Sequence, residues 1–107
     1  MKTKFEGIAR VKRPTLQALR RDFEILKMKT SETIIEYFAR VMSTSNKMRS
    51  NGEQMKDVTI VEKILRMLTE KFNYVVVSIE ESKDIDALTI DGLQSSLIVH
   101  ERKFHKL

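Results

Sequence analysis

The chain has 107 residues, of which 41% are hydrophobic and 33% charged, so it can form a single small hydrophobic core. It has no cysteine, which excludes disulfides, thiolate catalysis and cysteine-based zinc sites on this chain. Its formal net charge is +5. No apolar run approaches the roughly 20 residues of a membrane span, and the N-terminus lacks a secretory signal. We therefore expect an intracellular, cytoplasmic protein with no membrane partner.

Two helices are expected in the first half of the chain. A proline at a first helical turn, followed by apolar residues at spacings of three and four, predicts a helix over residues 15–28. A second helix is expected over residues 31–51, because Thr30 or Ser31 can cap its start. Gly52 can take the left-handed conformation that ends a helix.

The third expected helix covers residues 57–69, opens with Asp57 as its cap, and carries apolar side chains around about half of its circumference. A helix packed on one core usually needs a stripe of only about 100°, although a deeply buried helix would show the same pattern. We interpret the surplus as a contact with a second copy of the chain. The contact residues predicted on this basis are Ile60, Lys63, Ile64 and Met67.

Two further helices complete the prediction of an all-α bundle of about five helices. Residues 72–82 include three consecutive valines, which favour strand, but no second strand-like run exists to pair with them. We therefore expect a short helix there. A last helix is expected over residues 89–103, with Thr89 as its cap and with Leu93 and Leu97 on one face.

Positive charge is concentrated in residues 1–29, which hold nine Lys or Arg and three acids, whereas the other 78 residues are close to neutral. Such a segment is typical of a nucleic-acid contact, or of a solvated charged face. The candidate nucleic-acid contacts are Lys2, Lys4, Arg10, Lys12, Arg13, Arg20 and Arg21. Because aromatic side chains for base stacking are sparse in this segment, only weak, salt-sensitive RNA binding is expected.

No pattern in the sequence predicts catalysis, a cofactor or a metal. A calcium-loop register beginning at Asp84 fails, because Leu88 and Thr89 occupy the positions of a ligand and of the turn glycine. His100 and His105 would point about 140° apart on a helix, so they cannot share a metal ion. We expect a protein that is not an enzyme and takes no small-molecule substrate.

The segment SETIIEYFARV resembles the major homology region of retroviral capsid proteins, with Glu32, Tyr37 and Arg40 at three of its pattern positions. The wider sequence is similar to the Gag polyprotein of plant copia-type retrotransposons. The similar blocks, between about Leu16 and Glu101, are LQALRRDFEILKMK, SETIIEYFARV, NGEQMKD, VEKILRML, KFNYVVVSIEESKD and LTIDGLQSSLIVHE. Their order and spacing together make the resemblance specific.

The resemblance implies the fold of a retroviral capsid C-terminal lobe, which is a compact bundle of four helices. It divides the chain into residues 1–29, a basic segment with the last helix of a mostly missing N-terminal lobe, and residues 30–107, the bundle. The glutamine and glycine of the retroviral motif fall on Met28 and Lys29 here. The part of the motif's hydrogen-bond network that we still expect is a contact between its glutamate and its arginine.

The function that follows is self-association. In retroviral relatives the second helix of the C-terminal lobe forms a two-fold dimer contact, and the apolar surface of residues 57–69 favours the same place. We expect a non-catalytic, capsid-type Gag module whose partner is a second copy, in a dimer or a virus-like particle. The alternatives are a basic RNA-binding module and a host-adopted Gag fragment that acts as an interaction adaptor.

Overall fold

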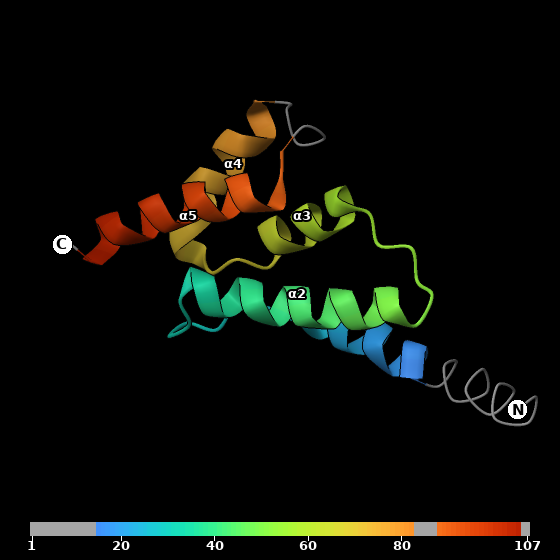
Figure 1. The fold of residues 1–107 in the computed structure, drawn as a ribbon. Coiled ribbons are helices and arrows are strands. Elements are labelled where there is room, and N and C mark those ends of the chain that lie inside the picture. The colour runs from blue at the N-terminus through green and yellow to red at the C-terminus, as the bar shows by residue number, and fades with distance from the viewer. Residues whose placement is uncertain (1–14, 83–87, 106–107) are drawn as a thin grey trace, which may run out of the picture.

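The computed structural model describes residues 15–82 and 88–105, which form α-helices and one 3-10 turn and contain no strand (Figure 1). The elements are a helix over residues 15–25, α2 (Ile34–Ser50), α3 (Asp57–Arg66), the 3-10 turn η1 (Glu70–Phe72), α4 (Asn73–Glu81) and α5 (Ile90–His105). The predicted all-α bundle of about five helices is confirmed. Asp84 and the residues before Thr15 lie outside the described ranges.

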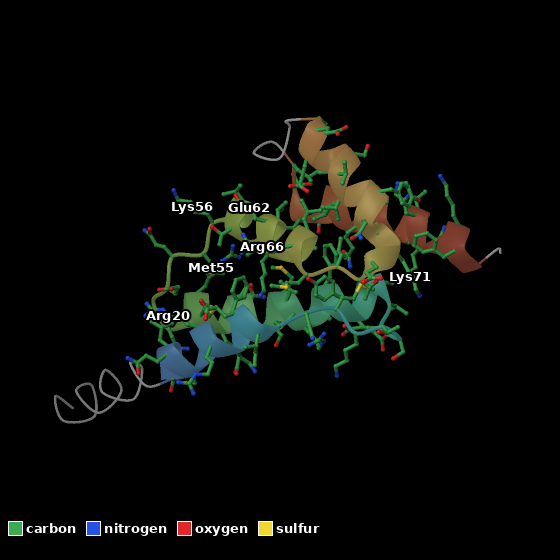
Figure 2. All side chains as sticks on the ribbon, turned by 180° about the vertical axis from the view of Figure 1, so that it is seen from behind. Arg20, Met55, Lys56, Glu62, Arg66 and Lys71 are labelled. Carbon is green, nitrogen blue, oxygen red and sulfur yellow. The ribbon has the colours of Figure 1, made fainter. Side chains whose placement is uncertain are left out.

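The core forms where α2, α3 and α5 pack against one another. Figure 1 shows α2 running along the lower part of the molecule, with α3 and α5 above it. Seen from behind, the helix of residues 15–25 lies across α2 (Figure 2). Leu26 and Met28, which follow that helix, are buried in the same core as the later helices. The division of the chain between residues 29 and 30 stays a prediction.

Helix α2 begins three residues later than the sequence predicted. Its cap is Thr33, whose hydroxyl accepts a hydrogen bond from the Glu36 N–H while the Glu36 carboxylate accepts one from the Thr33 N–H. The caps predicted at Thr30 and Ser31 are therefore wrong, because these two residues form a turn before the helix. The predicted left-handed residue is confirmed, since Gly52 has a φ of 93°.

Helix α3 is shorter than predicted, because it ends at Arg66. The Met67 carbonyl instead accepts a hydrogen bond at 3.0 Å from the backbone N–H of Met28. Asp57 is the first helical residue rather than the cap, and its carboxylate accepts a hydrogen bond from Arg49. The segment after α3 is therefore held by residue 28, which is far away in the sequence, and local sequence signals do not report such a contact.

The last two helices lie close to their predicted positions. The three-valine run forms the middle of α4, with Val75 buried against the core and Val77 51% exposed. At the start of α5 the Thr89 hydroxyl accepts a hydrogen bond from the Gly92 N–H, as predicted for the cap. Leu93 and Leu97 are fully buried, so the predicted inner face of this helix is confirmed.

Candidate functional site

The four residues predicted for the dimer contact do not form an exposed patch. Ile60 and Ile64 are fully buried, Lys63 is 6% exposed and Met67 is half-buried. The same monomer covers the other apolar side of α3 as well, with Val61 fully buried. The predicted division of this helix into a core side and a dimer side is therefore wrong, because α3 is buried within one chain on both sides.

Part of this covering comes from the basic N-terminal segment. The Lys63 ammonium donates a 2.6 Å hydrogen bond to the carbonyl oxygen of Glu24 and lies 5.5 Å from the centroid of the Phe23 ring. Its position by the last turn of the helix of residues 15–25 complements the negative end of the helix dipole. Burial is the main cause that lowers the pKa of Lys63. No local sequence signal marks this contact, because it joins residues 39 positions apart.

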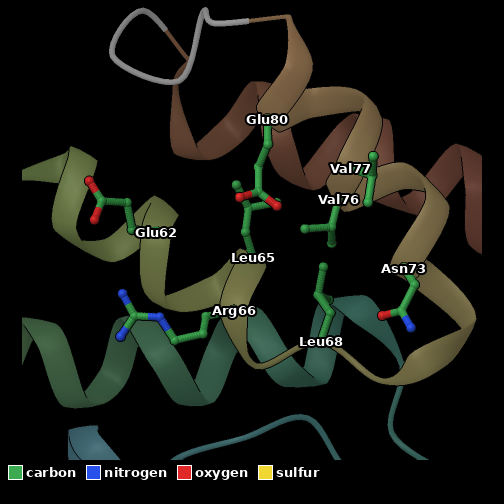
Figure 3. Close-up of a pocket in the computed structure, with 8 residues that line it drawn as sticks. All are labelled: Glu62, Leu65, Arg66, Leu68, Asn73, Val76, Val77 and Glu80. Carbon is green, nitrogen blue, oxygen red and sulfur yellow. The ribbon is translucent and has the colours of Figure 1, made fainter.

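The exposed side of α3 faces α4 across an open groove of about 670 Å³ (Figure 3). Apolar side chains from the two helices and from the residues after α3 line it, and charged side chains of both signs stand beside them. Its lining residues are Glu62, Leu65, Arg66, Leu68, Asn73, Val76, Val77 and Glu80. Sequence reasoning did not single out these positions as a contact surface.

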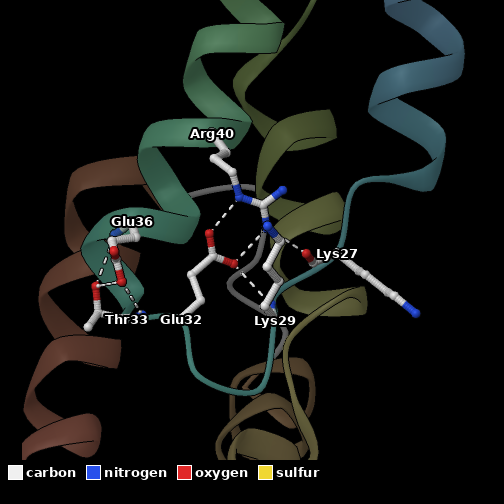
Figure 4. Close-up of polar contacts among 6 residues, drawn as sticks. All are labelled: Lys27, Lys29, Glu32, Thr33, Glu36 and Arg40. Atoms are coloured by element: carbon white, nitrogen blue, oxygen red, sulfur yellow. Dashed lines mark hydrogen bonds and ion pairs between the residues drawn. The ribbon is translucent and has the colours of Figure 1, made fainter.

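The expected contact between Glu32 and Arg40 is present and joins the start of α2 to the segment before it (Figure 4). Arg40 Nε donates to Glu32 Oε2 at 2.5 Å, and Arg40 Nη2 donates to Glu32 Oε1 at 2.6 Å. The same Nη2 donates to the Lys27 carbonyl at 2.7 Å, and the Lys29 N–H donates to the Glu32 carboxylate at 3.0 Å. One arginine therefore fixes the chain on both sides of a turn.

This bridge is partly buried, because the Glu32 side chain is 7% exposed and that of Arg40 is 36% exposed. The hydrogen bond from Arg40 is the main cause that lowers the pKa of the Glu32 carboxyl. Tyr37, the third motif residue, lies in the core, where its hydroxyl donates to the Ile64 carbonyl at 3.1 Å. Burial raises the pKa of Tyr37. All three motif residues therefore contribute to the fold.

A family model for the gag-polypeptide of LTR copia-type elements matches residues 1–106. The chain belongs to this family. No curated protein and no solved structure shows significant similarity to this copia-type Gag chain. The Gag family is structural and typically non-catalytic, which agrees with a site made of packing and hydrogen bonds. Among its described helices, none is long and apolar enough to cross a membrane.

Most of the basic residues predicted to contact nucleic acid in this Gag chain lie outside the described residues. Those five are Lys2, Lys4, Arg10, Lys12 and Arg13. Arg20 is described and pairs with Glu53 through two hydrogen bonds of 2.8 and 3.0 Å, whereas the neighbouring Arg21 is exposed. The positive charge of Arg20 is therefore already paired within the chain.

The sequence predicts no metal site in this Gag chain. No cluster of three potential metal ligands occurs in residues 15–82 and 88–105. His100 is half-buried, and its Nδ1 lies 3.1 Å from the hydroxyl of Tyr74, whose ring it meets edge-on. The side chain of His105 lies outside the described part.

Proposed function

We propose that this copia-type Gag chain is a non-catalytic self-association module whose copies meet through the groove between α3 and α4. The observation that supports the proposal most strongly is the exposed apolar lining of this groove, in which Val77 is 51% exposed and Val76 and Leu68 are half-buried. Burying such a surface against another molecule removes apolar area from water. The contact differs from the one predicted from sequence in its residues, although α3 takes part in both.

The charges around the groove favour a second copy of the same chain as the partner. Glu62 and Arg66 are both exposed and are one helical turn apart on α3. In a two-fold contact with antiparallel α3 helices, Glu62 of one copy comes opposite Arg66 of the other, and the pair occurs twice. Electrostatic complementarity of this kind fixes the register of an interface, while the apolar lining supplies its stabilisation.

The proposal is tested by Val77→Asp, followed by the average mass in sedimentation as the protein concentration is raised. Wild type is expected to self-associate. Val77→Asp is expected to weaken the affinity between copies at the groove by about tenfold or more, because it places a charge in an apolar interface. Val99→Asp is the matched control, since Val99 is a valine of α5 with a similar exposure of 53%. It should associate like wild type.

Two results would contradict the proposal. If wild type stays a single subunit at millimolar concentration, self-association is not its function. If the two variants associate equally well, copies do not meet at the groove, since Val77 lines the groove and Val99 does not. Circular dichroism of both variants checks that each substitution, at an exposed position, leaves the helices intact.

A further inference from the structure

A second apolar surface lies on the outer side of α2, far along the chain from the groove just described. Ile35 is 60% exposed there, and Ala39, one turn later, is exposed as well. In Figure 1, no described helix lies in front of α2. Seen from behind, in Figure 2, the helix of residues 15–25 lies over α2. One face of the helix therefore has no partner within the described part of the chain.

Two surface grooves run along this face and meet at Ala39. One lies between α2 and the end of the preceding helix, and it is lined by Ile25, which is 70% exposed. The other lies between α2 and α5, and it is lined by Met42 and Ile90. Helices pack by placing the side-chain ridges of one helix into the grooves of another, so this grooved face has a shape that suits a second helix.

The charges along this face match those of a second copy in the antiparallel direction. Glu36 and Lys47 are both exposed, and at about 100° per residue they lie on the same flank of α2. They are equally far from the point between Val41 and Met42, one on each side. A two-fold axis through that point brings Glu36 of each copy opposite Lys47 of the other, so that the charge pair forms twice.

We propose that α2 of a second copy packs antiparallel on this face, with Ile35 and Ala39 in the contact and Glu36 paired with Lys47 across it. This contact is separate from the contact between copies proposed at the α3–α4 groove and does not depend on it. A single two-fold contact closes at a dimer, whereas two different two-fold contacts on one subunit allow assembly to continue. The two surfaces together therefore give the chain the valence that an extended assembly requires.

The first test is cross-linking through a single introduced cysteine, because the natural chain has none. Ser43 is exposed and lies close to the proposed axis, so Ser43→Cys is expected to give covalent dimers with a short bismaleimide at micromolar protein concentration. Ser95→Cys, an exposed serine on α5, is the matched control and should give few dimers. Both cysteine variants are made in the Val77→Asp background, so that the proposed contact between copies at the α3–α4 groove does not contribute to the yield of cross-linked dimer.

The second test changes the charges. When Lys47→Glu is added to the Ser43→Cys variant, the yield of cross-linked dimer is expected to fall by about tenfold, because both charge pairs become repulsive. Adding Glu36→Lys to the same chain restores opposite charges and should restore the yield, although it also removes the carboxylate of the capping box that Glu36 forms with Thr33. Lys103→Glu, at an exposed lysine of α5, is the control that should leave the yield unchanged.

The proposal is overturned if Ser43→Cys gives no more dimer than Ser95→Cys, since the face then belongs to another molecule or to solvent. It is also overturned if Lys47→Glu and Lys103→Glu lower the yield equally, because the effect then reflects net charge alone. Failure of the proposed contact at the groove leaves both results interpretable, since all the variants compared carry the same Val77→Asp substitution. In the variant that carries both Lys47→Glu and Glu36→Lys, the helicity measured by circular dichroism separates loss of the contact between copies from loss of the fold.

Discussion

Arg40 shows how much one side chain can fix when its donors are spread over a turn. Its guanidinium bonds both oxygens of Glu32 and the carbonyl of Lys27, and the Glu32 carboxylate accepts a further bond from the Lys29 N–H. The planar fork of arginine suits this bidentate geometry, which the single ammonium of lysine cannot reproduce. The course of residues 27–32 therefore depends on one arginine located a turn and a half inside the next helix.

We predict that Arg40→Ala lowers the free energy of unfolding by about 3 kcal/mol, at the lower end of the cost of breaking a buried ion pair, since Arg40 is itself partly exposed. The nearly buried Glu32 carboxylate would be left without its countercharge. Urea unfolding followed by circular dichroism measures the effect. Arg21→Ala, at an exposed arginine, should change the stability by no more than about 0.5 kcal/mol. A loss below about 1 kcal/mol for Arg40→Ala would mean an ordinary surface pair.

At the scale of elements, the start of α2 is held by two different devices. The capping box of Thr33 and Glu36 is local, and it satisfies two backbone N–H groups within the first turn. The next N–H, that of Ile34, donates at 2.9 Å to the carboxylate of Glu101, which belongs to α5. A negative charge there also suits the positive end of the α2 dipole. The first helix of the core and the last are therefore joined at this point.

We predict that Glu101→Ala lowers the free energy of unfolding by about 1–2 kcal/mol, because the Ile34 N–H loses its partner and the helix end loses a favourable charge. Amide hydrogen exchange at the first turn of α2 should speed up along with it. Glu101→Gln keeps an acceptor oxygen, so it should recover part of the loss. Equal stability of wild type and Glu101→Ala would show that water satisfies the Ile34 N–H equally well.

At the scale of the whole molecule, α3 is one of the three helices that pack against one another to form the core. It contacts both α2 and α5, and its Lys63 holds the end of the helix of residues 15–25. Four of its five apolar residues, Ile60, Val61, Ile64 and Leu65, are buried, and Val58 is half-buried. The buried residues of α3 stabilise the subunit, so a contact with another copy can use only the exposed side of this helix, which carries Glu62 and Arg66.

We predict that Ile64→Asp unfolds the chain, because it places an unpaired carboxylate at a fully buried position, and such changes cost about 4–5 kcal/mol or more. Loss of the helical circular dichroism signal and of a cooperative thermal transition would show this. Val77→Asp, the same charge at an exposed position of α4, should stay folded. If Ile64→Asp gave a folded monomer, the packing of α3 described above would be wrong.

The sequence by itself determined the features that depend on a few neighbouring residues. The 3.6-residue apolar period predicted the helices, Gly52 predicted a left-handed residue, and Thr89 predicted a cap. The resemblance to the capsid motif added the Glu32–Arg40 contact, because that motif is itself a short local pattern. Each of these signals lies within about two turns of the chain, where the backbone geometry is known in advance.

Only the tertiary structure decided which surfaces are free. The apolar face of α3 had the same pattern whether a second copy or the chain's own segment covered it, and residues 23–28 proved to cover part of it. The cap of α2 moved to Thr33 because the residues before it are drawn into the Arg40 bridge. Periodicity reports that a residue is apolar and on which side of its helix it lies, but its partner is chosen by packing between segments distant in sequence.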